Sequence, residues 1–193
     1  MEPITARQAW AVFEQADCLY TQTQVEAALD AMAGRISEAL RDRNPLVVCL
    51  MNGGVVPFGI LLPRLQFPLE IDYVHATRYR KQLTGGDLHW LAGPYVSAKG
   101  RTVLLVDDIL DEGTTLDAIV HRYQADGASA IYKAVLVRKD RRRIVPVEAE
   151  FVGLEIPNRY VFGYGMDYQG YLRNAPGIYA VSAASGSSSG DGR

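Results

Sequence analysis

Residues 103–116, VLLVDDILDEGTTL, carry a short apolar strand straight into acidic residues, a glycine and two threonines. Apolar runs of this length that end at turn signals are typical of fully buried strands. Because the acids follow the strand directly, the sequence places negative charge at the carboxyl end of a central strand. In an open α/β sheet, that edge is where ligands bind.

The residues after the acids predict a phosphate-binding turn. Gly113, Thr114 and Thr115 precede a segment whose apolar residues have helical spacing. Backbone N–H groups, hydroxyls and the positive end of a helix dipole suit a phosphate. The preceding acids suit sugar hydroxyls or a divalent cation. Acids at a strand end also serve as turn formers and helix caps, but the order acids, glycine, two threonines favours a sugar-phosphate site.

Length, composition and charge limit the class of protein. The chain has 193 residues, of which 48% are hydrophobic, so we expect one domain with a substantial core. The net charge is −2, and no apolar run approaches the roughly 20 residues that cross a membrane. We therefore expect no nucleic-acid partner and no membrane partner. Cys18 and Cys49 lack metal-ligand or disulfide-framework spacing, which indicates a reducing cytoplasm.

Alternating helix and strand signals predict an α/β fold with a mostly parallel, doubly wound sheet flanked by helices. A capping box at Thr23 and Glu26 predicts a helix that ends before Asn44. A further helix is expected at residues 55–65, and residues 78–93 are expected to form a long loop or loose hairpin. The expected strands of the core are residues 46–51, 69–75, 103–106 and 131–137.

From residue 138 onward the pattern changes to short strands and turns, at residues 151–154, 160–164 and 178–182. These are expected to form a small hood lobe with the N-terminal segment. The expected domain is residues 1–183, with a core at about 44–140 and a hood from about 1–43 and 141–183. Residues 184–193 are expected to be a disordered tail. Apart from Lys139, the basic residues 138–143 are expected to form a solvated turn.

Four separated motifs together resemble the hypoxanthine-guanine phosphoribosyltransferases, of the type I phosphoribosyltransferase family. They are the segment at 103–116, MNGG at 51–54, the corner Arg138-Lys139, and FVGLEIPNRYVFGYGMDY at 151–168. The resemblance covers roughly residues 46–182 and implies the type I phosphoribosyltransferase fold. It implies magnesium-dependent transfer of ribose 5-phosphate from phosphoribosyl diphosphate to N9 of hypoxanthine or guanine. The products would be IMP or GMP and pyrophosphate.

The resemblance assigns the sugar-phosphate half of the site. Asp107 and Asp108 would hold the ribose hydroxyls, directly or through magnesium. The 5-phosphate would be wrapped by the turn that follows, made of Glu112, Gly113, Thr114 and Thr115. The family often has a basic or histidine side chain where this chain has Thr114, so one charge-assisted contact is missing here.

The pyrophosphate would bind at the turn after the first strand. That turn is Met51, Asn52 and Gly53, where family members commonly carry a non-proline cis peptide and often a basic residue in place of Asn52. Since Asn52 has no charge, Arg173 and a second magnesium held near Asp167 would supply it.

The resemblance places the purine between the core and the hood. Lys139 would donate to O6, Tyr160 would stack on the ring, and the Val161 carbonyl would accept from the guanine amine. Asp167 is assigned to the purine pocket as well as to a metal. Asp111 would accept or hydrogen-bond the N7 proton and is the expected catalytic residue.

Residues 77–87 correspond to the mobile lid of the family, with Arg78 and Tyr79 placed to cover the reacting centre. The family also implies a homo-oligomer, either a dimer or a tetramer. Two alternatives stay open: a xanthine-preferring relative, and a regulator of the same fold that senses phosphoribosyl diphosphate and binds nucleic acid.

Overall fold

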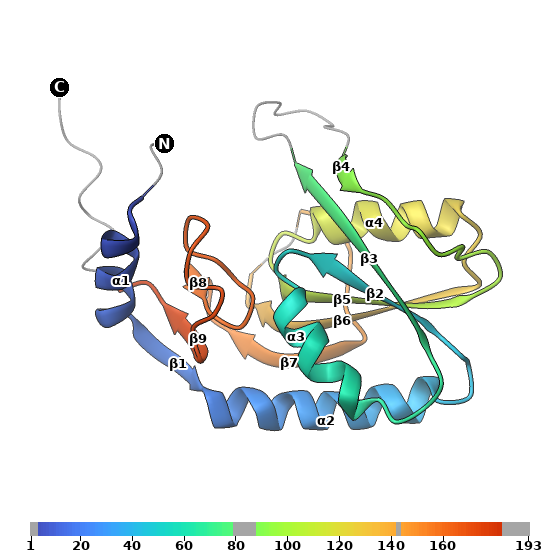
Figure 1. The fold of residues 1–193 in the computed structure, drawn as a ribbon, viewed down its shortest axis with the longest axis horizontal. Coiled ribbons are helices and arrows are strands. Elements are labelled where there is room, and N and C mark those ends of the chain that lie inside the picture. Colours follow the sequence, from blue (N-terminus) through green and yellow to red (C-terminus); the bar gives the residue numbers. More distant parts are fainter. Residues whose placement is uncertain (1–3, 79–87, 142–143, 183–193) are drawn as a thin grey trace.

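The computed structural model describes residues 4–78, 88–141 and 144–182, without the side chains of Arg78 and Leu88. The predicted tail at residues 184–193 lies outside these ranges. Two sheets, four α-helices and one 3₁₀ helix are described (Figure 1). The helices are α1 (Ala6–Glu14), α2 (Gln22–Leu40), α3 (Val55–Leu61), η1 (Leu62–Arg64) and α4 (Thr114–Ala125). The strands are β1 (Asp17–Thr21), β2 (Leu46–Met51), β3 (Glu70–Arg78), β4 (Leu88–Ala92), β5 (Thr102–Leu110), β6 (Ala130–Lys139), β7 (Phe151–Ile156), β8 (Val161–Phe162) and β9 (Gly177–Ala180).

The larger sheet has six strands in the order β4-β3-β2-β5-β6-β7, and only β4 is antiparallel to its neighbour. The predicted mostly parallel sheet is therefore confirmed. From β2 the chain moves outward to β3 and β4, whereas from β5 it moves the other way, to β6 and β7. The strand order thus reverses between β2 and β5. At such a switch point, the loops at the carboxyl ends diverge and leave a crevice for a ligand.

Helices cover both faces of this sheet, with α2 and α3 on one side and α4 on the other (Figure 1). Alternate residues of β5 belong to different cores: Leu104 packs with α2, and Leu105 packs with α4. Burial on both faces explains why β2 and the first part of β5 read as continuous apolar runs.

The start of α2 differs from the prediction by two residues. Thr21 caps the helix, and it exchanges hydrogen bonds with Gln24 in a capping box. The predicted box at Thr23 and Glu26 is therefore wrong. Two overlapping box-like sequences occur here, and the pairing of Thr21 with Gly177 in β9 holds the chain extended up to that residue.

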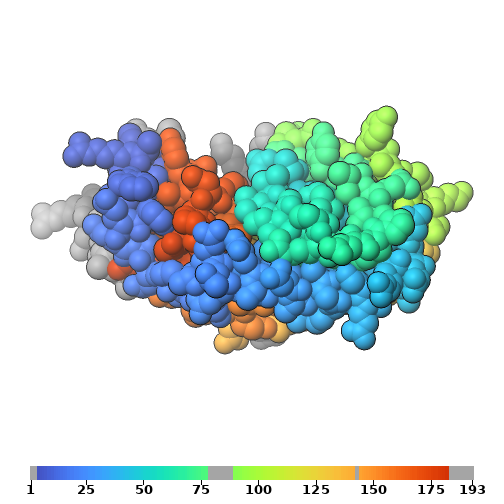
Figure 2. Space-filling view, turned by 60° about the horizontal axis from the view of Figure 1, so that its bottom comes forward, coloured from blue at the N-terminus to red at the C-terminus, as the bar shows by residue number. Residues whose placement is uncertain are grey.

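The hood is smaller than predicted and consists of α1, β1, β8 and β9. Its three strands form an antiparallel sheet in the order β1-β9-β8, packed by Phe13, Phe162 and Tyr179. Figure 2 shows the red and orange hood atoms between the blue N-terminal atoms and the teal atoms around α3. Strand β7 was expected in the hood, but it pairs in parallel with β6 as the edge of the large sheet. Residues 88–92 form the second strand of a hairpin with β3, which is one of the two predicted forms.

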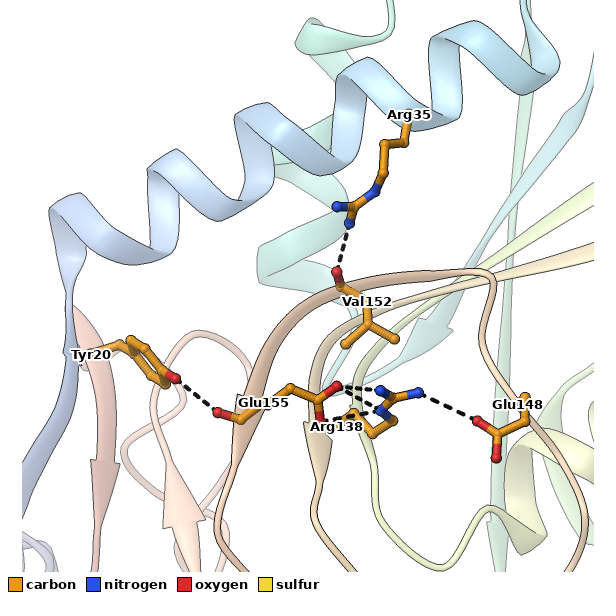
Figure 3. A network of polar contacts seen from close by, with 6 residues as sticks. All are labelled: Tyr20, Arg35, Arg138, Glu148, Val152 and Glu155. Carbon is orange, nitrogen blue, oxygen red and sulfur yellow. Dashed lines mark hydrogen bonds and ion pairs between the residues drawn. The ribbon is translucent and has the colours of Figure 1, made fainter.

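A polar network fixes β7 to its surroundings (Figure 3). The Tyr20 hydroxyl donates to the Glu155 carbonyl at 2.8 Å, and the Arg35 guanidinium donates to the Val152 carbonyl at 2.6 Å. Arg138 Nε donates to the Glu155 carboxylate at 2.9 Å, and the same guanidinium lies 3.5 Å from Glu148. The expectation of a solvated turn is therefore wrong for Arg138. The network ties β1, α2 and β6 to one edge strand.

The loop between β8 and β9 lies so close to the end of β2 that the two backbones are in contact. Gly165 has a φ of +107°, and a Cβ added there would lie 2.0 Å from the Gly53 carbonyl oxygen. A backbone atom cannot move aside cheaply, so this contact requires glycine.

We expect Gly165→Ala to lower the free energy of unfolding by about 3 kcal/mol, which combines the cost of a positive φ with that of overpacking. Gly170→Ala is the matched control, since its φ is +91° and an added Cβ would meet nothing within 4 Å. It should cost only about 1 kcal/mol. Urea denaturation of both variants measures the difference, and equal losses would contradict close packing of the hood on β2.

Candidate active site

A cavity of about 690 Å³ lies at the carboxyl ends of β2, β3 and β5. Every residue predicted to bind phosphoribosyl diphosphate lines it: Met51, Asn52, Gly53, Asp107, Asp108, Glu112, Gly113, Thr114, Thr115 and Arg173. The structure thus brings together segments more than 100 residues apart in the sequence, from Met51 to Arg173. The cavity lies at the switch point between β2 and β5, as expected for an open α/β sheet.

A second cavity of about 250 Å³ adjoins the first. It is lined by all four residues predicted to bind the purine, Lys139, Tyr160, Val161 and Asp167. The two cavities share Asp108, Ile109, Asp111 and Asp167. One large polar cavity and one smaller cavity with an exposed aromatic ring therefore meet at the predicted catalytic carboxylate.

The turn at Gly113 presents the start of α4 to the larger cavity. Gly113 is the residue before the helix, with a φ of +80°, and Thr114 and Thr115 begin the helix. A Cβ on Gly113 would lie 2.4 Å from Cγ1 of Val147, so both the conformation and the space favour glycine. The first N–H groups of a helix have no partners within it. The cavity therefore faces backbone donors at this point.

The turn after β2 closes the opposite wall. The Met51–Asn52 peptide bond is cis, as the resemblance implies. A Cβ added to Gly53 would lie 2.0 Å from Oδ2 of Asp108, so only glycine lets this turn approach the acids of β5. The two strand ends are thus in contact across the switch point.

Asp107 and Asp108 are the most perturbed acids of the site. Loss of hydration and the neighbouring Asp108 raise the pKa of Asp107 well above its usual value, and burial also raises the pKa of Asp108. Burial and these two acids raise the pKa of the Cys49 thiol to about 12. Among the described residues, the cation Arg173 lies 4.0 Å from Asp108 and 2.8 Å from Asp167. This corner can therefore take up more positive charge.

The donors suit magnesium held jointly with a substrate. Carboxylate oxygens are hard ligands, and Mg²⁺ usually keeps water and substrate phosphate oxygens as its remaining ligands. In the described ranges, no three His, Cys, Asp or Glu side chains converge as a preformed metal site. Asp107 and Asp108 would therefore bind the ion together with the substrate, and Asp167 could hold a second ion from the other wall.

Asp111 is bound by two cations. The Lys139 ammonium donates to its Oδ2 at 2.6 Å, and Arg141 Nη1 donates to its Oδ1 at 2.9 Å. Arg141 Nη2 also lies 3.8 Å from the Glu112 carboxylate. The expected solvated turn is wrong for Arg141. No motif marked this residue, because the contact depends on β5 and β6 being neighbours with Leu110 opposite Arg138.

The predicted lid is only partly described. Thr77 lines the larger cavity, and β3 ends at Arg78, which places the start of the segment at the cavity. The Arg78 side chain and Tyr79 lie outside the described residues.

Comparison with known proteins places the chain in one family. The family described as the phosphoribosyl transferase domain matches residues 15–169. A protein from Staphylococcus epidermidis named hypoxanthine-guanine phosphoribosyltransferase is 31% identical over 166 residues, which is 86% of this chain and 93% of that protein. A protein from Tritrichomonas foetus named hypoxanthine-guanine-xanthine phosphoribosyltransferase is 30% identical over 161 residues, which is 83% of this chain and 88% of that protein.

Solved structures agree with this placement. A hypoxanthine-guanine phosphoribosyltransferase from Bacillus anthracis has a TM-score of 0.81 and 29% identity, over 86% of this chain and 98% of that chain. For the fold alone, a hypoxanthine phosphoribosyltransferase from Staphylococcus aureus has a TM-score of 0.85 at 24% identity, over 92% of this chain and 97% of that chain.

The raised pKa of Asp107 predicts how stability depends on pH. A folded carboxyl pKa above the unfolded value means that the folded state holds its proton longer. Stability from this group is therefore present below the unfolded pKa of about 3.9 and is lost as pH rises through the folded pKa. Asp107→Asn removes the ionisable group and with it the loss of stability at high pH. The asparagine still offers an acceptor for the Asp108 N–H, which donates to Asp107 at 2.9 Å.

We expect Asp107→Asn to raise the unfolding temperature of the ligand-free protein by about 3–5 °C at pH 8 and by less at pH 5. The exposed Asp42 provides the control variant Asp42→Asn, which should change neither value. Calorimetry at both pH values measures the effect, and a lower unfolding temperature for Asp107→Asn at pH 8 would contradict the assigned pKa shift.

Proposed function

The chain belongs to the phosphoribosyl transferase family, and from that membership we propose that it is a purine salvage enzyme that makes IMP and GMP in the cytoplasm. It transfers ribose 5-phosphate from phosphoribosyl diphosphate to N9 of hypoxanthine or guanine, releasing pyrophosphate. The observation that carries this proposal is the meeting of the two cavities at Asp111. One cavity has the donors for a sugar phosphate, and the other has the size and the groups for a purine.

Phosphoribosyl diphosphate occupies the larger cavity. The backbone donors of Gly113, Thr114 and Thr115 hold the 5-phosphate, and the hydroxyls of both threonines supplement them. Asp107 and Asp108 accept from the ribose hydroxyls. Loss of hydration disfavours their negative charges, and positive charge that arrives with the substrate offsets this cost. Bound magnesium supplies charge neutralisation for the pyrophosphate.

The pyrophosphate lies toward the turn after β2. Met51, Asn52 and Gly53 line the cavity there, and none of them has a charged side chain. Their backbone N–H groups therefore donate to the pyrophosphate. Arg173 provides the cation beside this turn, because it donates to the carbonyl of Gly165, which packs against Gly53, and it is also bound to Asp167. Its guanidinium exchanges this carboxylate for the pyrophosphate when the substrate binds.

The purine occupies the smaller cavity. Lys139, whose side chain is only 11% exposed, donates to O6 from the cavity wall. Tyr160 is half exposed and offers one ring face for stacking, and the Val161 carbonyl accepts from the guanine amine. Adenine is excluded because its 6-amino group is a donor that faces the Lys139 donor.

Asp111 handles the proton at the centre. The base attacks the ribose through N9 and must lose its N7 proton, so a carboxylate next to both cavities is placed to accept it. The same negative charge offsets the positive charge that develops on the ribose as pyrophosphate leaves.

A preference for xanthine is the second candidate, because the relative from Tritrichomonas foetus carries xanthine in its name. Incubation with phosphoribosyl diphosphate, magnesium and one of hypoxanthine, guanine, xanthine or adenine separates the candidates. We expect nucleotide from hypoxanthine and guanine and none from adenine. No product from any 6-oxopurine, together with salt-sensitive binding of RNA or DNA, would favour the regulator instead.

A second copy of the chain is the proposed partner. Ile71 and Tyr73 lie two residues apart on β3, so they share one face, and each is 54% exposed. Leu91 on the neighbouring β4 is also exposed. An apolar surface of this kind is typical of a homo-oligomer interface, and the mass of the protein in solution tests it. None of the described helices is long and apolar enough to cross a membrane.

Asp111→Asn keeps the size of the side chain and one accepting oxygen, but its other oxygen becomes an NH2 donor and the side chain cannot take the N7 proton. We expect kcat to fall on the order of 100-fold, because proton transfer by a placed side chain contributes that much or more. Binding of phosphoribosyl diphosphate, measured by calorimetry without the purine, should change less than about threefold. Equal losses in kcat and in that binding would assign Asp111 to substrate binding rather than to catalysis.

Lys139→Ala removes the proposed donor to O6. The KM for hypoxanthine should rise roughly 10- to 100-fold, which is the worth of a hydrogen bond from a charged group, while kcat changes less. Steady-state kinetics with varied hypoxanthine measure both constants. An unchanged KM would place the O6 contact elsewhere.

A further inference from the structure

We propose that Arg141 is a positioning residue for the catalytic carboxylate, holding Asp111 from outside the two cavities with its proton-accepting oxygen toward the purine. The proposal rests on the function proposed above for Asp111. Arg141 lies in the basic segment that the sequence suggested was a solvated turn, and no recognised motif includes it.

The backbone at the end of β6 directs two cations to one acid. The Asp140 N–H donates to the Ile156 carbonyl at 2.8 Å, and the Arg141 N–H donates back to the Lys139 carbonyl at 3.0 Å. This tight turn brings the side chains of Lys139 and Arg141 to the same point. Each takes a different oxygen of Asp111, at 2.6 Å and 2.9 Å respectively.

The two cations approach Asp111 from different sides. Lys139 lines the smaller cavity, whereas Arg141 lines neither cavity. Lys139 is therefore the cation that a purine meets, and its ammonium turns toward O6 when the base binds. Arg141 then remains as the donor that fixes the carboxylate plane.

A guanidinium suits this task better than an ammonium. Its planar fork donates from two nitrogens at once, and here Nη1 bonds Asp111 while Nη2 lies 3.8 Å from Glu112. The second contact draws the Glu112 carboxylate to the same cation, and Glu112 lies in the turn that binds the 5-phosphate. Arg141 therefore also supplies a positive charge beside a phosphate turn that has threonine rather than a cation at position 114.

The test compares Arg141→Ala and Arg141→Lys with the wild-type protein in the hypoxanthine assay. A lost positioning contact should lower kcat about tenfold in Arg141→Ala, because small misplacements of a catalytic group reduce rate rather than binding. The KM for hypoxanthine should stay within about twofold of the wild-type value. Arg141→Lys restores the charge and one donor, so its kcat should return to within about threefold of wild type.

Arg122→Ala is the matched control, since Arg122 makes a surface ion pair with Asp126 at 2.8 Å on α4, away from both cavities. It should keep wild-type kcat, and its unfolding temperature should match that of Arg141→Ala. A kcat of Arg141→Ala within twofold of wild type would overturn the inference alone, as would a loss that lysine does not recover. If wild type and Arg122→Ala both make no nucleotide, the proposed function fails, and the inference fails with it.

Discussion

The parallel pairing of β2, β5 and β6 is the constraint on which the site depends. Cys49 lies opposite Val106, and Val106 lies opposite Ala134, so the three strands end together at one edge. That edge collects the turn after β2, the acids of β5 and the cationic end of β6. Parallel strands need long crossovers and burial on both faces, which α2, α3 and α4 provide. The helices therefore bury the two faces of the sheet whose strand ends carry the site, and α4 also brings its first residues to the larger cavity.

Charge at this edge is arranged in two unlike groups. Asp107 and Asp108 lie together, and burial raises the pKa of both although Arg173 lies 4.0 Å from Asp108. Asp111, only a few residues later, has a cation on each oxygen. The first pair favours the arrival of positive charge with the sugar phosphate, whereas the second arrangement keeps a carboxylate oriented. In the proposed function, one strand and its loop thus support binding in one cavity and proton transfer at the boundary with the other.

Local sequence was sufficient to predict those elements whose conformation depends only on adjacent residues. Strand β2 has the predicted bounds, because its apolar run is bounded by Pro45 and the glycines of the turn. The turn at Gly113 was predictable because its positive φ and helix start depend on adjacent residues. The positions of strand β7 and Arg141 were not predictable from local sequence, since they depend on which strands lie beside β6. Pairing with β6 outweighed the hood-like pattern of short strands, and Arg141 meets Asp111 only after β5 and β6 have paired.

The most direct test of the account is a crystal structure with magnesium, hypoxanthine and an unreactive analogue of phosphoribosyl diphosphate. The distance between the purine N7 and the nearer carboxylate oxygen of Asp111 tests whether Asp111 can accept the N7 proton. The account predicts about 2.6–3.2 Å, the range in which a proton can be transferred directly. The 5-phosphate would lie at the start of α4 and O6 would lie at Lys139. A purine bound with N7 far from Asp111, or outside the cavity of Lys139 and Tyr160, would contradict it.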